Sequence, residues 1–247
     1  MKIKNLSLQN KTLLAPMTNE SDHAFRIRCR QGGAALVFTQ KFHINALRNN
    51  LQKFHSDLEI NPEEHPIAIQ LIGNDPKILA NVMELLEPYN YDGYDLNLGC
   101  PSPEAIRDGI GGALLKHPQE IRPLINAMVQ ATNKAVSAKI RIGFDNFSIN
   151  ALEVAKVIEE EGADFLTIHG RTVQAGYSGE NNLDIIRSVT AQVNIPIVGN
   201  GDIVDGPSAK KILKYTKCEL IMVGRAALKN PHIFLEINKY LGGKYRT

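Results

Sequence analysis

The stretch Asp95-Leu96-Asn97-Leu98-Gly99-Cys100-Pro101 says most about the fold of this chain. Polar and apolar residues alternate in it, so a β-strand places Asp95 and Asn97 on one face and the two leucines on the other. A strand in a helix-covered parallel sheet is normally apolar along nearly its whole length. The polar face at the end of this strand therefore predicts a ligand pocket, with Cys100 in the turn that follows.

Similar apolar runs recur along the chain, and there are eight in all. They cover residues 13–17, 35–40, 66–73, 93–99, 137–143, 164–170, 196–201 and 219–225. Most are separated by segments of helical period, such as the one that Asp75-Pro76 opens with an N-cap and a first-turn proline. Strands that alternate with helices form a parallel sheet. Eight such units in about 250 residues predict an α/β protein, a TIM (β/α)8 barrel forming one domain over residues 1–247.

The N-terminal residues predict a hairpin of residues 3–8 and 12–14 around Asn10-Lys11, which could close the bottom of the barrel. The main alternative fold is a doubly wound open sheet. Such a sheet would carry a GxGxxG fingerprint in its first strand-to-helix turn, and this chain has none there.

The composition is that of a globular protein: 247 residues, 43% hydrophobic and 22% charged. A net charge of +2 gives weak support for a nucleic-acid partner. The three cysteines are far apart and lack metal-ligand spacing, so neither a disulfide framework nor a metal site is indicated. The sequence has no signal-peptide pattern and no run near the ~18 apolar residues of a membrane helix. We expect a cytoplasmic protein without a membrane or metal partner, and no protein partner can be inferred.

In such barrels the chemistry lies at the C-terminal ends of the strands. Lys139 lies inside a predicted strand, where a lysine needs an anionic partner unless it reaches solvent at the rim. The turns at 199–202 (GNGD) and 223–225 (VGR) are rich in glycine, which lets backbone N–H groups approach an anion. The last two strands of such barrels commonly hold a phosphate, and Arg225 would add a guanidinium there. This set suits a phosphorylated planar cofactor better than a metal or a Ser/His/Asp nucleophile.

Several longer motifs carry a family resemblance. They are LAPM at 14–17, IQLIGNDP at 69–76, DLNLGCPSPE at 95–104, GIGGALL at 109–115, AKIRIGF at 138–144, TIHGRTVQAGYSG at 167–179, IPIVGNGDI at 195–203 and MVGRAALKNPHIF at 222–234. In these motifs the chain resembles the tRNA-dihydrouridine synthases. The resemblance implies an oxidoreductase that binds FMN in a TIM barrel and reduces tRNA uridines with electrons from NADPH or NADH. Members of that family usually carry a helical C-terminal domain, which is not evident here.

The resemblance also implies roles for single residues. The cofactor-binding residues would be Pro16, Met17, Thr18, Gln70, Lys139, His169, Asn200, Gly201, Asp202, Gly224 and Arg225. Cys100 would be the catalytic residue, giving a proton to C5 of uridine while the reduced flavin gives hydride to C6. A thiol with the ordinary pKa of ~8.5 is mostly protonated at neutral pH and can act as a general acid.

The expected substrate-binding residues are Asn97 beside the thiol and, for RNA phosphates near the mouth, Arg107, Arg141 and Arg171. Arg26 is a further basic residue available for phosphates.

Three other functions stay open at this point. One is an FMN-dependent reductase of a small molecule, similar to dihydroorotate dehydrogenase or old yellow enzyme. Another is a non-redox phosphate-binding barrel, an aldolase or isomerase, which would leave Cys100 and Gln70 without a role. The third is an RNA-binding chaperone that kept the fold but lost turnover, against which the intact Cys100 and Lys139 argue.

Overall fold

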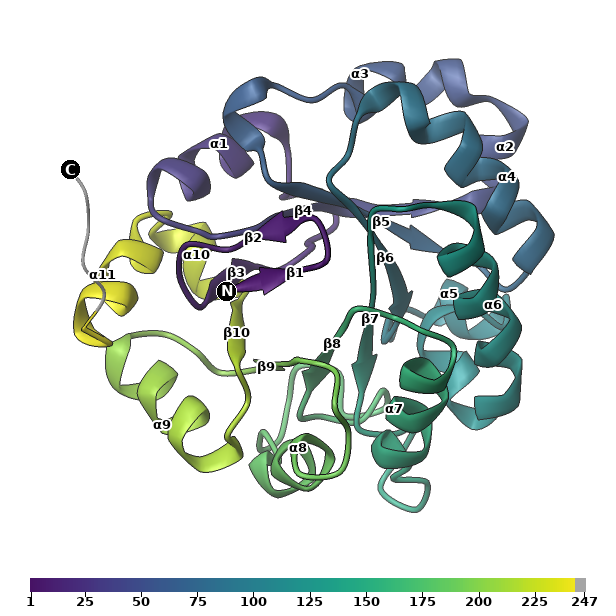
Figure 1. Cartoon of the computed structure of the whole chain (residues 1–247). Helices are drawn as coiled ribbons and strands as arrows, with labels where there is room; N and C mark the ends of the chain where they lie inside the picture. The colour runs from purple at the N-terminus through teal and green to yellow at the C-terminus, as the bar shows by residue number, and fades with distance from the viewer. Residues whose placement is uncertain (243–247) are drawn as a thin grey trace.

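The computed structural model describes residues 1–242 and shows a barrel of eight parallel strands surrounded by helices (Figure 1). The strands are β3 (Thr12–Leu14), β4 (Val37–His43), β5 (Ile67–Ile72), β6 (Gly93–Leu98), β7 (Ala135–Arg141), β8 (Phe165–His169), β9 (Ile197–Asn200) and β10 (Leu220–Val223). Their order is β3-β10-β9-β8-β7-β6-β5-β4. The barrel closes where Leu14 N donates to Leu36 O at 3.0 Å and Ala35 N to Thr12 O at 2.8 Å. The predicted TIM barrel is thus confirmed; residues 243–247 of the predicted domain lie outside the described part.

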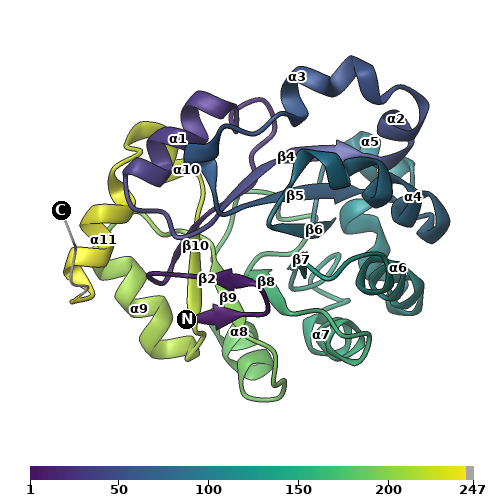
Figure 2. The same ribbon diagram turned by 45° about the horizontal axis from the view of Figure 1, so that its top comes forward.

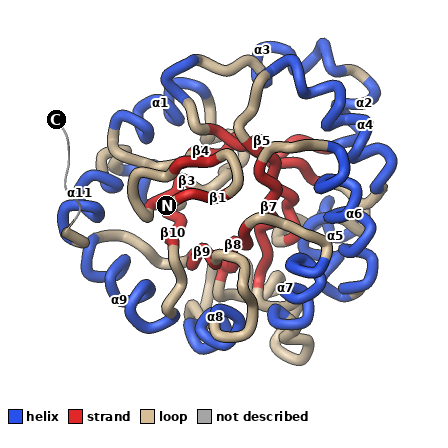
Figure 3. The backbone as a smooth tube through the Cα atoms, in the orientation of Figure 1, coloured by secondary structure: helices blue, strands red, loops and turns tan. Residues whose placement is uncertain are grey.

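The helices form the outer layer, which Figure 3 shows in blue around the red strands. The α-helices are α1 (His23–Gln31), α2 (Ile44–Asn49), α3 (His55–Leu58), α4 (Pro76–Leu86), α5 (Pro103–Arg107), α6 (Pro118–Ala131), α7 (Ala151–Glu160), α8 (Leu183–Thr190), α9 (Gly206–Thr216), α10 (Arg225–Lys229) and α11 (Ile233–Tyr240). Short 3-10 turns are η1 (Leu51–Phe54), η2 (Pro62–Glu64), η3 (Glu87–Tyr89) and η4 (Gly111–Lys116). As predicted, Asp75 caps α4, its carboxylate accepting from Lys77 N and Ile78 N. None of the helices in residues 1–242 has the length and apolar character that a bilayer crossing needs.

A small hairpin closes the bottom of the barrel (Figures 1 and 2). It consists of β1 (Lys2–Ile3) and β2 (Leu6–Ser7), paired antiparallel. The predicted plug exists, but the predicted pairing of residues 3–8 with 12–14 is wrong. The chain turns earlier, at Lys4, whose φ of 49° is in the left-handed region. Residues 12–14 instead form barrel strand β3, which pairs in parallel with β10.

Two apolar layers leave room for a polar site at one end of the barrel. The larger layer lies between strands and helices, while a second one fills the lower barrel interior and includes Ile3, Leu6 and Leu8 of the hairpin region. Above it the inward-facing residues are polar. The register sets Gln70, Asp95 and Ser137 side by side on β5, β6 and β7. The next polar level holds Asn97, Lys139 and Thr167 on β6, β7 and β8.

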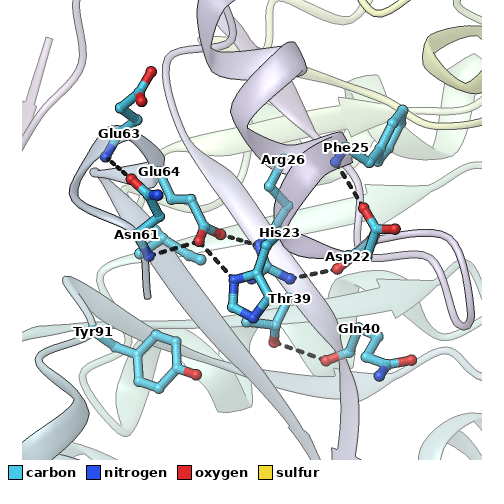
Figure 4. Close-up of polar contacts among 12 residues, drawn as sticks. Asp22, His23, Phe25, Arg26, Thr39, Gln40, Asn61, Glu63, Glu64 and Tyr91 are labelled. Carbon is cyan, nitrogen blue, oxygen red and sulfur yellow. Dashed lines mark hydrogen bonds and ion pairs between the residues drawn. The ribbon is translucent and has the colours of Figure 1, made fainter. Parts of the chain in front are cut away.

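A buried ion pair fastens α1 to η2 beside the barrel (Figure 4). Arg26 is 2% exposed, and its guanidinium contacts the fully buried carboxylate of Glu64 and the carbonyl of Ser21. Glu64 also accepts from Asn61 N at 2.9 Å, and His23 Nδ1 lies 2.8 Å from it. The expectation that Arg26 is free for RNA phosphates is therefore wrong, because its charge is neutralised inside the protein.

Candidate functional site

A cavity of about 1040 Å³ lies at the C-terminal ends of the barrel strands. Every predicted cofactor residue and the predicted proton donor line it, together with two of the predicted substrate residues. These are Pro16, Met17, Thr18, Gln70, Asn97, Cys100, Lys139, Arg141, His169, Asn200, Gly201, Asp202, Gly224 and Arg225. Arg107 and Arg171 are not part of its wall. Residues from distant parts of the sequence meet here because parallel strands end at the same rim of the barrel.

Cys100 lies in the turn after β6, where its main chain is held from two sides. Its N–H donates to Asn97 Oδ1 at 2.9 Å, and its carbonyl accepts from Gly112 N at 3.1 Å. A Cβ on Gly112 would lie 2.8 Å from that carbonyl oxygen, so this close approach needs glycine. The residue is 7% exposed and its Sγ lies 3.6 Å from Ser102 Oγ. The thiol is thus fixed on the cavity wall. The other two cysteines are buried and do not line the cavity.

Lys139 projects from β7 into the same cavity. Burial lowers its pKa to about 8; repulsion by Arg141 acts in the same direction, and attraction by Asp95 opposes both. Lys139 is half-buried at the cavity wall, where its ammonium would meet a ligand that accepts hydrogen bonds. Thr167 lies beside it on β8; its Oγ1 is buried and lacks a hydrogen-bond partner, but the residue is not part of the cavity wall.

His169 ends β8 at the cavity wall and is 7% exposed. Burial lowers its pKa far below the usual range, and the positive charges of Lys139, Arg141, Arg171 and Arg225 lower it further. The imidazole is therefore neutral at physiological pH. Arg171 Nη1 lies 3.4 Å from Nε2 and can only donate, so Nε2 is the acceptor and the N–H on Nδ1 is left for a ligand.

The turns after β9 and β10 lie side by side on the cavity wall, since these strands are neighbours. Gly201 has a φ of +117°, which only glycine adopts easily, and a Cβ there would lie 2.7 Å from the side chain of Asn181. Asn200 Nδ2 donates to Met222 O at 2.8 Å and so ties the two turns together. Arg225 lies at the end of β10, with its guanidinium 3.6 Å from Asp202 and its side chain 59% exposed.

The three arginines predicted for RNA contact have different surroundings. Arg141 donates to the carbonyls of Gly99, Thr172 and Gly176 at 2.6–2.9 Å, so it braces the loops around Cys100. Arg171 is 6% exposed and makes a bidentate pair with Asp202, at 2.9 and 2.7 Å.

Arg107, at the end of α5, has a side chain that is 72% exposed and pairs with its neighbour Asp108 at 3.1 Å. It is the one of the three arginines whose guanidinium faces solvent.

Sequence reasoning assigned no role to two residues that the structure brings to the site. Asp95 is fully buried below the cavity and accepts hydrogen bonds from Gln70 and Ser137. Its place on the polar face of the strand was the available signal. Tyr177 is 63% exposed at the mouth, with its ring 5.6 Å from the Arg141 guanidinium and 5.2 Å from that of Arg225. It belongs to the YSG segment that ends the motif at 167–179.

Across residues 1–242 no group of three or more His, Cys, Asp or Glu side chains could hold a metal ion. The cavity wall carries the cationic side chains of Lys139, Arg141 and Arg225 and the amides of Gln70, Asn97 and Asn200, together with the carboxylates of Glu20, Asp202 and Glu236. The cations and amides offer hydrogen-bond donors to an organic ligand.

Comparison of the sequence with known proteins identifies the family to which it is related. The model of the dihydrouridine synthase (Dus) family matches residues 13–246. A tRNA-dihydrouridine synthase B of Pasteurella multocida is 37% identical over 234 residues, which cover 95% of this chain and 70% of that protein. The tRNA-dihydrouridine synthase B of Escherichia coli K12 is 35% identical over 246 residues, covering 98% of this chain and 75% of that one.

Among solved structures, histamine dehydrogenase from Rhizobium sp. 4-9 superimposes with a TM-score of 0.71 at 13% identity, over 98% of this chain and 47% of that one. A FabK mutant from Thermotoga maritima gives 0.55 at 17% identity, over 92% and 65%. At such low identity these two neighbours support the barrel fold alone. The sequence matches go further, because they extend over nearly the whole chain: the chain belongs to the dihydrouridine synthase family.

Proposed function

We propose that this protein reduces uridine to 5,6-dihydrouridine in tRNA, with FMN as the bound cofactor and NADPH or NADH as the reductant. Family membership supports the reaction, since the relatives named above are tRNA-dihydrouridine synthases. The observation that carries the proposal is one cavity whose wall holds the Cys100 thiol together with every residue predicted to bind the cofactor.

The residues present fit a flavin nucleotide. The cavity, at about 1040 Å³, lies slightly above the usual range for cofactor pockets, roughly 300–1,000 Å³, so it has room for a nucleotide cofactor. One side carries the ammonium of Lys139 and the amide of Gln70, which suit the polar edge of an isoalloxazine ring. Another side carries the Gly201 turn and Arg225, which suit a phosphate. When bound, FMN supplies the hydride that the reaction needs.

The chain's own residues would supply the proton and the electrostatics. Cys100 would hold a proton on Sγ and deliver it to C5 of the uracil ring, as a general acid. The two hydrogen bonds to its main chain keep the thiol at one position on the wall. Lys139 would balance negative charge near the cofactor ring, and neutral His169 would donate an N–H without adding charge.

The substrate base has to leave the tRNA stack to reach a cavity inside the barrel mouth. Tyr177 at that mouth offers an exposed ring to a nucleic acid. Arg107 is expected to contact a phosphate, because its guanidinium is exposed. Arg141 and Arg171 would act indirectly, by bracing loops.

Replacement of the thiol tests the proposal. We expect purified wild-type protein to release FMN on heating and to form dihydrouridine in unmodified tRNA when supplied with NADPH. Cys100→Ala should retain FMN but form dihydrouridine roughly 10²–10⁴-fold more slowly, the range that positioned acid catalysis contributes. Dihydrouridine is measured by mass spectrometry of digested tRNA, with Cys218→Ala as a control because that thiol is buried away from the cavity.

Unchanged turnover in Cys100→Ala would remove the proton-donor role. A colourless wild-type protein that takes up no FMN would contradict the flavin assignment. A yellow protein that reduces small molecules but no tRNA would favour the small-molecule reductase.

A further inference from the structure

A continuous chain of side-chain hydrogen bonds crosses three strands below the cavity. Ser137 Oγ on β7 donates to Asp95 Oδ1 on β6 at 2.6 Å. Gln70 Nε2 on β5 donates to the other carboxylate oxygen at 2.7 Å. Asn97 Nδ2 then donates to Gln70 Oε1 at 2.8 Å, and Asn97 Oδ1 accepts from Cys100 N at 2.9 Å. The chain therefore runs from a buried carboxylate to the main chain of the proposed proton donor.

The direction of every bond in this chain is fixed from both ends. An ionised carboxylate can only accept hydrogen bonds, so Gln70 must turn its NH2 group toward Asp95 and its oxygen toward Asn97. At the other end, the backbone N–H of Cys100 can only donate, so Asn97 must turn its oxygen toward Cys100 and its NH2 group toward Gln70. The two requirements are independent, and they demand the same orientation of both amides.

We propose that Asp95 is a positioning residue that sets the orientation of Gln70 and, through it, of Asn97 and the Cys100 turn. This proposal rests on the proposed function, in which Gln70 meets the cofactor and Asn97 the substrate. Each amide uses one N–H within the chain and keeps a second one. With the ammonium of Lys139, these form a set of donors on the cavity wall. The ligand atoms that meet them must be acceptors, such as ring nitrogens and carbonyl oxygens.

The position of Asp95 is hard to explain by stability alone. The residue is 0% exposed, and an ionised carboxylate is costly to remove from water. Burial raises its pKa to about 6, while the hydrogen bonds from Ser137 and Gln70 and the charge of Lys139 limit the rise. The group thus stays mainly ionised at neutral pH, which keeps it a pure acceptor. An apolar residue would fill the space without setting the direction of the amides.

Two substitutions at this position separate hydrogen-bond direction from charge. Asp95→Asn loses the charge, but its carbonyl can still accept from Gln70 while its NH2 group donates to Ser137. Asp95→Leu has no acceptor, so Gln70 is free to turn over. Ser137→Ala is the matched control, because it removes a neighbour of Asp95 and leaves both amides their partners.

The first readout uses the protein without cofactor: the rate at which iodoacetamide alkylates Cys100, followed by peptide mass spectrometry. The second is the FMN dissociation constant. We expect Asp95→Asn and Ser137→Ala to stay within about threefold of wild type in both, since their amides keep acceptors. Asp95→Leu should weaken FMN binding about tenfold or more and change the alkylation rate, because an amide N–H loses its acceptor.

A second variant reaches the same chain from its other end. Asn97→Asp still accepts from Cys100 N but can no longer donate to Gln70, so it opposes the same amide orientation without altering Asp95. We expect it to weaken FMN binding by a factor similar to that of Asp95→Leu, which keeps the test valid even if the leucine variant does not fold. Comparing KM and kcat on tRNA then separates effects on the cofactor, which Gln70 meets, from effects on the substrate, which Asn97 meets.

Wild-type FMN affinity in both Asp95→Leu and Asn97→Asp would overturn the proposal. An Asp95→Asn variant as impaired as Asp95→Leu would also overturn it, because charge rather than direction would then matter. If wild-type protein bound no FMN, the proposed function would fail, while the alkylation rates would still decide whether Asp95 positions the Cys100 turn.

Discussion

At the scale of single residues, Lys139 combines a half-buried position on the cavity wall with an unusual protonation equilibrium. Its pKa of about 8 in the folded protein lies below the ~10.4 of a lysine in an unfolded chain. Between these two pH values the folded state holds fewer protons than the unfolded one. By linkage, the contribution of this group to stability grows as pH rises from about 8 to about 10.4. Its positive charge, which ligand binding would use, is lost over the same rise.

We therefore expect FMN binding by the cofactor-free protein to weaken as pH rises through about 8, by up to tenfold per pH unit, because binding favours the charged lysine. Titration of FMN fluorescence against pH measures this. Lys139→Met should flatten the dependence. Lys41→Met is the control: this lysine also lines the cavity, but donates to Thr18 at 2.8 Å. Equal pH profiles for wild type and Lys139→Met would contradict the prediction.

At the scale of elements, the turns after β8 and β9 are joined by an ion pair. Arg171 follows β8 and donates both Nη groups to Asp202, which follows β9. Asp202 has a φ of 54°, a left-handed conformation that costs a non-glycine residue about 1–2 kcal/mol. Arg171 also donates to the carbonyls of Ser178 and Gly179. The pair thus joins the Gly201 turn to the loop that holds Ser178 and Gly179.

Loss of the Arg171–Asp202 ion pair should weaken cofactor binding more than it weakens RNA binding. We expect Arg171→Gln to lower the free energy of unfolding by about 1–3 kcal/mol and to weaken FMN binding, since Asp202 and the carbonyls of Ser178 and Gly179 lose their charged donor. Arg171→Lys should not restore either, because an ammonium cannot bond both carboxylate oxygens in the same way. Chemical denaturation and FMN titration measure the two effects.

Because Arg171 is buried and paired with Asp202, we expect Arg171→Gln to have little effect on the salt dependence of tRNA binding. Arg107→Gln serves as the comparison, because that guanidinium is exposed. It should reduce the slope of log affinity against log salt by about 0.7–0.9 for each phosphate that the arginine neutralises. A slope change in Arg171→Gln as large as in Arg107→Gln would mean that Arg171 reaches RNA.

At the scale of the whole molecule, the barrel is closed at the bottom by the β1–β2 hairpin and carries its cavity at the other end. Leu6 is 2% exposed inside the lower barrel layer, against residues such as Phe38 and Phe165. The hairpin therefore completes the apolar interior that lies below the two polar levels of the barrel.

We expect Leu6→Ala to lower the free energy of unfolding by about 2–5 kcal/mol, the usual loss when a buried leucine leaves a cavity. Urea denaturation followed by circular dichroism measures it. Leu85→Ala on α4, whose leucine is 39% exposed, should stay within about 0.5 kcal/mol of wild type. Equal effects of the two substitutions would show that the hairpin adds no packing to the barrel.

The sequence by itself determined the eight strands, the barrel, the bottom plug and the polar rim around Cys100. These follow from local signals, namely apolar periodicity and the residue types at strand ends, and parallel topology then brings the strand ends together. Only the tertiary structure decided the partners: Glu64 for Arg26, Asp202 for Arg171 and Asp95 for Gln70. These partners lie 25 or more residues apart, and strand register and loop packing select them, which no local pattern encodes.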